Sequence, residues 1–286
     1  MGAAFLITLR EGLEISLVLA ILISYLVKTG RRSEMGAVWQ GTGLATFLCL
    51  VVGIAIYAAV GGLHGTANQI VEGSIATAAA LVLTWMICWM RTNARTLGAE
   101  LRGKVDAATT VTALAVIAFV ATVREGLETV LFLLSAETGS ASGAQVVVGG
   151  IAGLVVSAIL GYLIYRGGNR LNLKRFFQIT GVLLILFAAG LVGKAFHEFR
   201  EALGLESGAL IDPVWTIESG VWAKGTFYDF MKGFFGWHKE TELIRLIAYF
   251  AYLVPIMYLF LKPGGRPAAA TSADSGNSNR EQLTPA

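Results

Sequence analysis

Long apolar stretches alternate with short polar loops along almost the whole chain. Seven stretches are nearly free of charge, and each is about as long as the roughly 20 apolar residues that cross a bilayer as a helix. They are residues 3–27, 37–60, 70–90, 107–135, 144–165, 175–196 and 243–261. The pattern therefore predicts an all-α polytopic membrane protein with seven transmembrane helices.

The composition agrees with this prediction. Hydrophobic residues make up 55% of the 286 residues and charged residues only 14%, whereas soluble domains carry about 25% charged residues. These proportions exclude a soluble enzyme, a nucleic-acid binder and a secreted disulfide scaffold. The net charge of +3 does not indicate nucleic-acid binding, because the basic residues lie mainly in short loops between the apolar stretches.

The loops carry their positive charge on one side of the predicted membrane. Those after the first, third and fifth stretches are basic, and the first contains Lys28, Arg31 and Arg32. The alternate loops, residues 61–69 and 136–143, contain no Lys or Arg. Because basic loops stay in the cytoplasm, we expect the N-terminus outside and the C-terminus inside.

Two segments lie outside the predicted helices. Residues 197–242 form the longest loop, which is net acidic and is expected on the outer side. Within it, residues 221–237 mix aromatic and polar residues, a pattern that fits a helix lying at the membrane interface or an ordinary structured loop. The transmembrane domain is predicted over residues 1–262. Residues 263–286 are rich in Pro, Ala, Ser and Gly and are predicted to be a disordered cytoplasmic tail.

One motif occurs twice, as TLREGLE at residues 8–14 and TVREGLE at residues 122–128. Two neighbouring stretches also correspond, since Gly41, Gly53 and Tyr57 align with Gly149, Gly161 and Tyr165. We therefore predict two three-helix repeats, about 3–90 and about 107–196, followed by a seventh helix at 243–261. Because three is odd, the copies would cross the membrane in opposite directions, as in transporters whose substrate site lies near the midplane.

The repeated motif places ionisable groups inside two predicted spans. The first copy contains Arg10, Glu11 and Glu14, and the second contains Arg124, Glu125 and Glu128. On a helix, the two carboxylates of a copy share a face and the arginine lies beside the second. The glycine between them, Gly12 or Gly126, allows a neighbouring helix to approach closely.

These six groups predict a cation site. Each would cost roughly 2.5–3.5 kcal/mol if it faced lipid, so they must face one another or a wet pathway. Two guanidinium groups and four carboxylates leave a formal charge of −2, and carboxylate oxygens favour hard cations. Ferric or ferrous iron, manganese, magnesium and calcium all fit, as does a proton relay. A proton-coupled exchanger, a membrane-embedded metalloenzyme and a sensor without transport are therefore alternatives.

A second group of candidate residues lies at the outer ends of two predicted helices. His197, Glu198 and Glu201 lie on adjacent helical faces beside the acidic loop, where they could collect cations or serve as ordinary surface charges. Glu72, at the outer start of the third span, could join them. Alternatively, it could stabilise the N-terminus of its helix.

The chain resembles the high-affinity iron permease family, also described as oxidase-linked iron transporters, and within it the bacterial Efe-system iron permeases. The resemblance covers nearly the whole of residues 1–262. It is carried by FLITLREGLE at 5–14, EGSIATAAALVLTWMICWMR at 72–91, VREGLETVLFLL at 123–134, GGNRLNLKRFFQITG at 167–181 and LILFAAGLVGKAFHEFREA at 184–202.

The resemblance implies a multi-pass iron permease of the bacterial inner membrane that is not an enzyme. It implies that the four motif glutamates (Glu11, Glu14, Glu125, Glu128) bind iron in transit and that Arg10 and Arg124 orient them. Iron would be the transported substrate, with no permanently bound cofactor. The resemblance further implies that the iron is ferric and is handed over by an extracytoplasmic iron-binding protein or an oxidase of the peroxidase or multicopper type.

Overall fold

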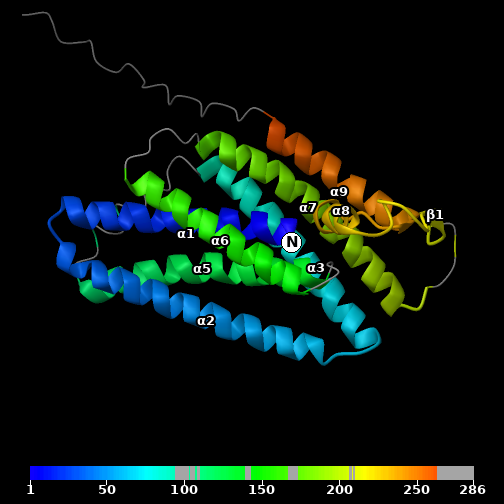
Figure 1. Ribbon diagram of the computed structural model, residues 1–286, viewed down its shortest axis with the longest axis horizontal. Helices are drawn as coiled ribbons and strands as arrows, with labels where there is room; N and C mark the ends of the chain where they lie inside the picture. The colour runs from blue at the N-terminus through cyan, green and yellow to red at the C-terminus, as the bar shows by residue number, and fades with distance from the viewer. Residues whose placement is uncertain are drawn as a thin grey trace, which may run out of the picture.

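A computed structural model describes residues 1–93, 103, 107, 110–138, 143–166, 173–205, 208 and 210–262. Over the described residues, six of the seven predicted apolar stretches lie within a long helix, and the stretch 107–135 overlaps one that begins at Val111 (Figure 1). These helices are α1 (Gly2–Lys28), α2 (Met35–Gly61), α3 (Thr66–Asn93), α5 (Val111–Thr138), α6 (Gly143–Tyr165), α7 (Leu173–Ala202) and α9 (Leu243–Leu261). The predicted tail, residues 263–286, lies outside the described residues.

Five of the long helices are apolar enough to cross a membrane by length and composition. They are α2 together with the short 3₁₀ helix η1 (Arg32–Glu34) before it, α3, α6, α7 and α9. Helices α1 and α5 have 27 and 28 residues, which is more than the roughly 20 that a bilayer requires. Each carries the three charged residues of one motif copy, so apolar composition alone does not mark it as a span. The chain is thus an all-α polytopic membrane protein.

The long helices pack mainly against partners that are distant in the sequence. Helix α1 runs along α6, α2 along α5, and α3 along α7, while α9 covers α7 (Figure 1). Helices α1 and α5, which carry the motif copies, also contact each other. The largest apolar core lies where α1, α3, α5 and α7 meet and includes Ile7, Leu83, Phe132 and Ile185.

The motif glycines lie at close contacts between helices. A Cβ atom added at Gly12 of α1 would lie 2.9 Å from Cβ of Ser157 on α6. One added at Gly126 of α5 would lie 3.2 Å from Cβ of Cys49 on α2. Real Cβ atoms rarely approach so closely, so both positions need glycine for the packing seen here. The predicted close approach at both glycines is confirmed.

The segment between α7 and α9 folds against the ends of the long helices. Its strands β1 (Pro213–Thr216) and β2 (Glu240–Glu242) pair in an antiparallel two-stranded sheet that the sequence pattern did not predict. Helix α8 (Thr226–Phe235) confirms that the aromatic stretch contains a helix, and it packs against α1 and α7. It ends at Gly236, whose φ of 64° is a left-handed conformation that favours glycine.

Candidate metal-transport site

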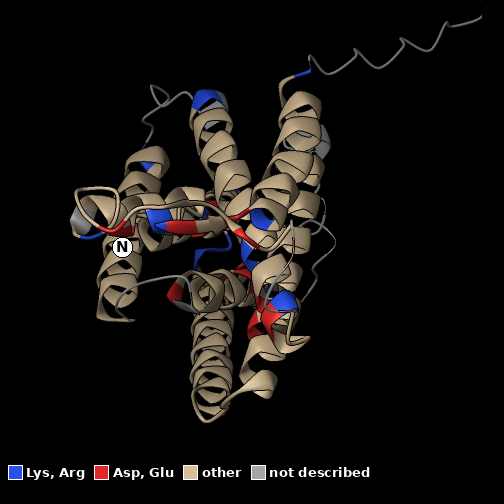
Figure 2. Ribbon diagram, turned by 90° about the vertical axis from the view of Figure 1, so that its right-hand side faces the viewer, with Lys and Arg blue, Asp and Glu red and all other residues tan. Residues whose placement is uncertain are grey.

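The two motif copies meet in the interior of the helix assembly, where Figure 2 shows acidic and basic segments close together. One carboxylate oxygen from each of Glu11, Glu14 and Glu125 lies within 4.8 Å of the other two. Glu128 lies one turn further along α5. Among the described residues, no other group of three or more His, Cys, Asp or Glu side chains has this spacing. The structure therefore brings α1 and α5 together through their acidic residues.

The cluster is largely closed to its surroundings. Arg10 is 2% exposed and Glu11 is 1% exposed, and Glu125 and Glu128 are also buried. Each of the four glutamates has one buried carboxylate oxygen without a hydrogen-bond partner in the described part of the chain. Buried acceptors are normally satisfied, because an unpaired buried polar group is costly. Three of these oxygens, the Oε2 atoms of Glu11, Glu125 and Glu128, are therefore available to a cation, whereas Glu14 Oε1 lies 3.1 Å from Arg10 Nη2.

Each arginine forms ion pairs with both carboxylates of its own motif copy. Arg10 Nη1 lies 3.5 Å from Glu11 Oε1, and Arg10 Nη2 lies 3.1 Å from Glu14 Oε1. Arg124 Nε lies 3.9 Å from Glu125 Oε1 and 3.2 Å from Glu128 Oε1. With two guanidinium groups shared among four carboxylates, the cluster keeps the formal charge of −2 expected from the sequence.

Helix α3 holds both arginines, a role that the sequence analysis did not assign. Arg10 donates to two methionine sulfurs, from Nη1 to Met86 Sδ at 3.2 Å and from Nη2 to Met90 Sδ at 2.8 Å. The guanidinium of Arg124 lies over Trp85 and Trp89, 5.5 and 4.9 Å from the ring centres. The Met and Trp pairs are each spaced four residues apart, so each forms one stripe along the helix.

The residues predicted to collect iron lie together at one end of α3 and α7, but cations already pair with several of them. Lys194 Nζ of α7 lies 2.8 Å from Glu72 Oε2 of α3 and 3.9 Å from Glu198 Oε1. Asn68 donates to the other oxygen of Glu72 at 2.8 Å. Glu72 thus ties α3 to α7.

The remaining two residues of this group, His197 and Glu201, join a second network of polar contacts. His197 lies 3.0 Å from Glu242 Oε1 and 3.4 Å from Glu201 Oε1. Arg200 Nη2 contacts the same two carboxylates at 2.9 and 3.4 Å. Within the described residues, His197, Glu198, Glu201 and Glu72 do not form a group with metal-ligand spacing. Their role in collecting iron stays a prediction.

The fold and the carboxylate cluster define a multi-pass membrane protein with a buried, negatively charged site suited to a hard cation. The chain belongs to the iron permease FTR1 family, which matches residues 1–262. The family resemblance expected from the motifs is therefore confirmed.

Individual relatives cover almost the same length. The ferrous iron permease EfeU of Yersinia pestis is 36% identical over 278 residues, covering 96% of this chain and 98% of the relative. The ferrous iron permease EfeU of Escherichia coli O6:H1 strain CFT073 is 36% identical over 276 residues, covering 95% and 99%. No solved structure matches the chain. The chain is thus an iron transporter of the bacterial inner membrane rather than an enzyme.

Proposed function

We propose that iron crosses the membrane through the site formed by Glu11, Glu14, Glu125 and Glu128. The observation that carries this proposal is the set of four buried carboxylate oxygens without hydrogen-bond partners among the described residues. Three of the four glutamates already lie within metal-ligand spacing. Arg10 and Arg124 hold the carboxylates in place and reduce their mutual repulsion, so the site can stay folded between one ion and the next.

We also propose that α1 and α5 cross the membrane and that α1–α3 and α5–α7 form an inverted repeat. Three pairs of close glycine contacts support this, because three contacts of the α1 segment with α6 have counterparts between α5 and α2. The residues of α1 and α5 correspond at one constant offset, and those of α2 and α6 at another. The pairs are Gly12–Ser157 and Gly126–Cys49, Gly149–Met1 and Gly41–Ala115, and Gly161–Ser16 and Gly53–Val130. A substrate site between α1 and α5 would then lie on the pseudo-twofold axis.

We propose ferrous iron as the transported form. The relatives from Yersinia pestis and Escherichia coli are named ferrous iron permeases, and the two positive charges of Fe²⁺ would balance the formal charge of −2 in the cluster. Ferric iron delivered by an extracytoplasmic oxidase or iron-binding protein is the second candidate. It is favoured by the all-oxygen donor set, since harder cations prefer such ligands.

Uptake of radioactive iron into liposomes that contain only the purified chain separates these two candidates. Ferrous iron under reducing conditions and chelated ferric iron are supplied in parallel. We expect saturable uptake of ferrous iron without any partner. Uptake of ferric iron alone, or only after a partner oxidase is added, would replace the ferrous proposal with the ferric one. If the folded protein moves neither form, the chain does not transport iron without a partner.

A further inference from the structure

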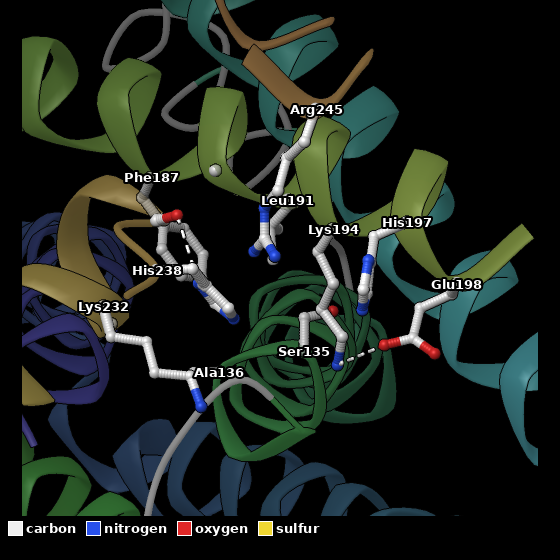
Figure 3. Close-up of a pocket in the computed structure, with 13 residues that line it drawn as sticks. Ser135, Ala136, Phe187, Leu191, Lys194, His197, Glu198, Lys232, His238 and Arg245 are labelled. Carbon is white, nitrogen blue, oxygen red and sulfur yellow. Dashed lines mark hydrogen bonds and ion pairs between the residues drawn. The ribbon is translucent and has the colours of Figure 1, made fainter. Parts of the chain in front are cut away.

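A cavity of about 190 Å³ lies between α5, α7, α8 and the start of α9, apart from the glutamate cluster. Its titratable lining residues are mainly basic. Lys194, Lys232 and Arg245 line it together with His197 and His238, against the single acidic residue Glu198. Figure 3 shows Arg245, Lys232 and His238 directed into the same space from three segments of the chain. Since a water molecule occupies roughly 30 Å³ in the liquid, the cavity has room for an ion of several non-hydrogen atoms.

Two of these cations are unpaired within the described residues. Lys194 is neutralised by Glu72 and Glu198, but no hydrogen bond or ion pair in the described part of the chain involves the charged groups of Arg245 or Lys232. Arg245 is only 5% exposed. The carboxylates of Glu242 and Glu198 attract its charge from a distance. A buried guanidinium without a direct ion pair is still unfavourable, because this attraction offsets only part of its desolvation. Its position beside an open cavity therefore indicates a missing anionic partner.

The surrounding groups report the same excess of positive charge. Burial, together with the Arg245 and Lys232 cations, lowers the pKa of His238 to about 2. Burial and repulsion by Arg245 and Lys194 lower the pKa of Lys232. An anion in the cavity would offset the repulsion that contributes to both shifts.

We propose that this cavity binds a phosphate group, held by Arg245 and Lys232. The guanidinium fork matches two oxygens of a phosphate, and the lysine ammonium supplies a second point charge. Two unpaired positive charges fit a group that carries one to two negative charges. The phosphate can come from free inorganic phosphate or from the headgroup of an anionic lipid such as phosphatidylglycerol. The iron site plays no part in this proposal.

The test uses the full chain, purified and delipidated in a maltoside detergent, which contains no phosphate. Thermal unfolding is followed during titration with inorganic phosphate, with chloride at equal ionic strength, and with phosphatidylglycerol. The variants are Arg245→Gln and Lys232→Gln. Lys239→Gln is the matched control, because Lys239 is 54% exposed and pairs with Glu240. A ligand that binds the folded state raises the unfolding temperature as its concentration rises.

We expect one phosphate source to stabilise the wild-type chain saturably and chloride to have no such effect. Arg245→Gln should weaken the affinity at least tenfold, and Lys239→Gln should leave it unchanged. Stabilisation by phosphate identifies a free-anion site, and stabilisation by phosphatidylglycerol alone identifies a lipid site. Without any anion, Arg245→Gln should be at least as stable as wild type, since it removes an unpaired buried charge.

The proposal is overturned if neither source gives a stabilisation that depends on Arg245. It is also overturned if Arg245→Gln is clearly destabilised in the absence of anions, since Arg245 would then have a structural partner in the protein. Lys232→Gln is a second test that does not depend on the folding of Arg245→Gln: unchanged phosphate affinity in this variant rejects the site.

Discussion

The guanidinium of Arg10 donates a hydrogen bond from Nη2 to the sulfur of Met90, 2.8 Å away on α3. The same nitrogen forms an ion pair with Glu14, so the sulfur helps to fix the arginine that positions a carboxylate of the proposed iron site. A thioether is a weak acceptor and does not compete with the carboxylate for charge. The contact thus orients Arg10 while leaving its charge to the glutamates.

Met90→Leu tests this orientation. Leucine keeps an apolar side chain of similar volume, a substitution that cores usually tolerate, but it removes the acceptor. We expect iron uptake to fall about three- to tenfold, corresponding to the roughly 0.5–1.5 kcal/mol of a typical hydrogen bond, with no change in the amount of folded protein. Met231→Leu on α8 is the matched control. Equal uptake by both variants would show that the sulfur contributes nothing to the site.

Trp89 has the corresponding role for Arg124, whose guanidinium lies 4.9 Å from the ring centre. Such a cation–π contact weakens from Trp to Phe and is absent with an aliphatic side chain. We therefore expect uptake to decrease in the order wild type, Trp89→Phe, Trp89→Leu. Trp39→Phe, at a position that is 57% exposed on α2, should behave as wild type. If iron uptake by the three proteins does not follow the strength of the cation–π contact, Trp89 does not have this role.

These partners mark the limit of what the sequence could predict. The paired Arg-Glu-x-x-Glu motifs required their six charges to face one another, and Glu11, Glu14 and Glu125 do meet. Met90 and Trp89 lie in an apolar span in which methionine and tryptophan are ordinary residues, so their composition carried no signal. Only the packing of α3 beside α1 and α5 brings them to the arginines.

The predicted collecting site shows the same limit. Glu72 and Glu198 were considered for their negative charge, but Lys194 lies between them in the structure. Lys194 is four residues before Glu198 on α7, a spacing at which helix side chains interact. The contact between Lys194 and Glu198 could therefore be predicted from the sequence. The contact between Lys194 and Glu72 could not, because it depends on the packing of α3 against α7.

The close approach at the motif glycines can be tested by substitution and rescue. Gly12→Ala places a Cβ 2.9 Å from Cβ of Ser157, and such overpacking typically costs about 1–3 kcal/mol. We expect a lower unfolding temperature and reduced uptake, with partial recovery in the double variant Gly12→Ala/Ser157→Gly. Gly43→Ala, at a position with nothing within 4 Å, should be neutral. A lack of rescue would show that the α1–α6 contact at Ser157 is not the cause.

His238 predicts a specific acid sensitivity. Its pKa is lowered to about 2 by burial and by the Arg245 and Lys232 cations, whereas an unfolded histidine titrates near 6.5. Below about pH 6.5 the unfolded chain therefore binds a proton that the folded chain does not, so stability is full above that pH and decreases as the pH falls towards 2.

This loss of stability at low pH can be measured from the unfolding temperatures of the wild type and His238→Gln at about pH 7.5 and about pH 5.5. The wild type should lose on the order of 1 kcal/mol more than the variant on acidification. Lys194, Lys232 and Arg245 line the same cavity and are present in both proteins, so the comparison isolates the contribution of His238. An equal loss in both proteins would mean that His238 is not held neutral in the folded state.

If the four motif carboxylates carry the iron, Glu125→Gln should stop transport. This substitution keeps the size of the side chain and removes one charge from the cluster. Iron uptake into liposomes is compared for the wild type, Glu125→Gln and Glu240→Gln, whose side chain is 59% exposed on β2, at equal amounts of inserted, folded protein. We expect uptake at background level for Glu125→Gln and at the wild-type rate for Glu240→Gln. Uptake by Glu125→Gln within twofold of the wild type would show that iron does not depend on the motif carboxylates.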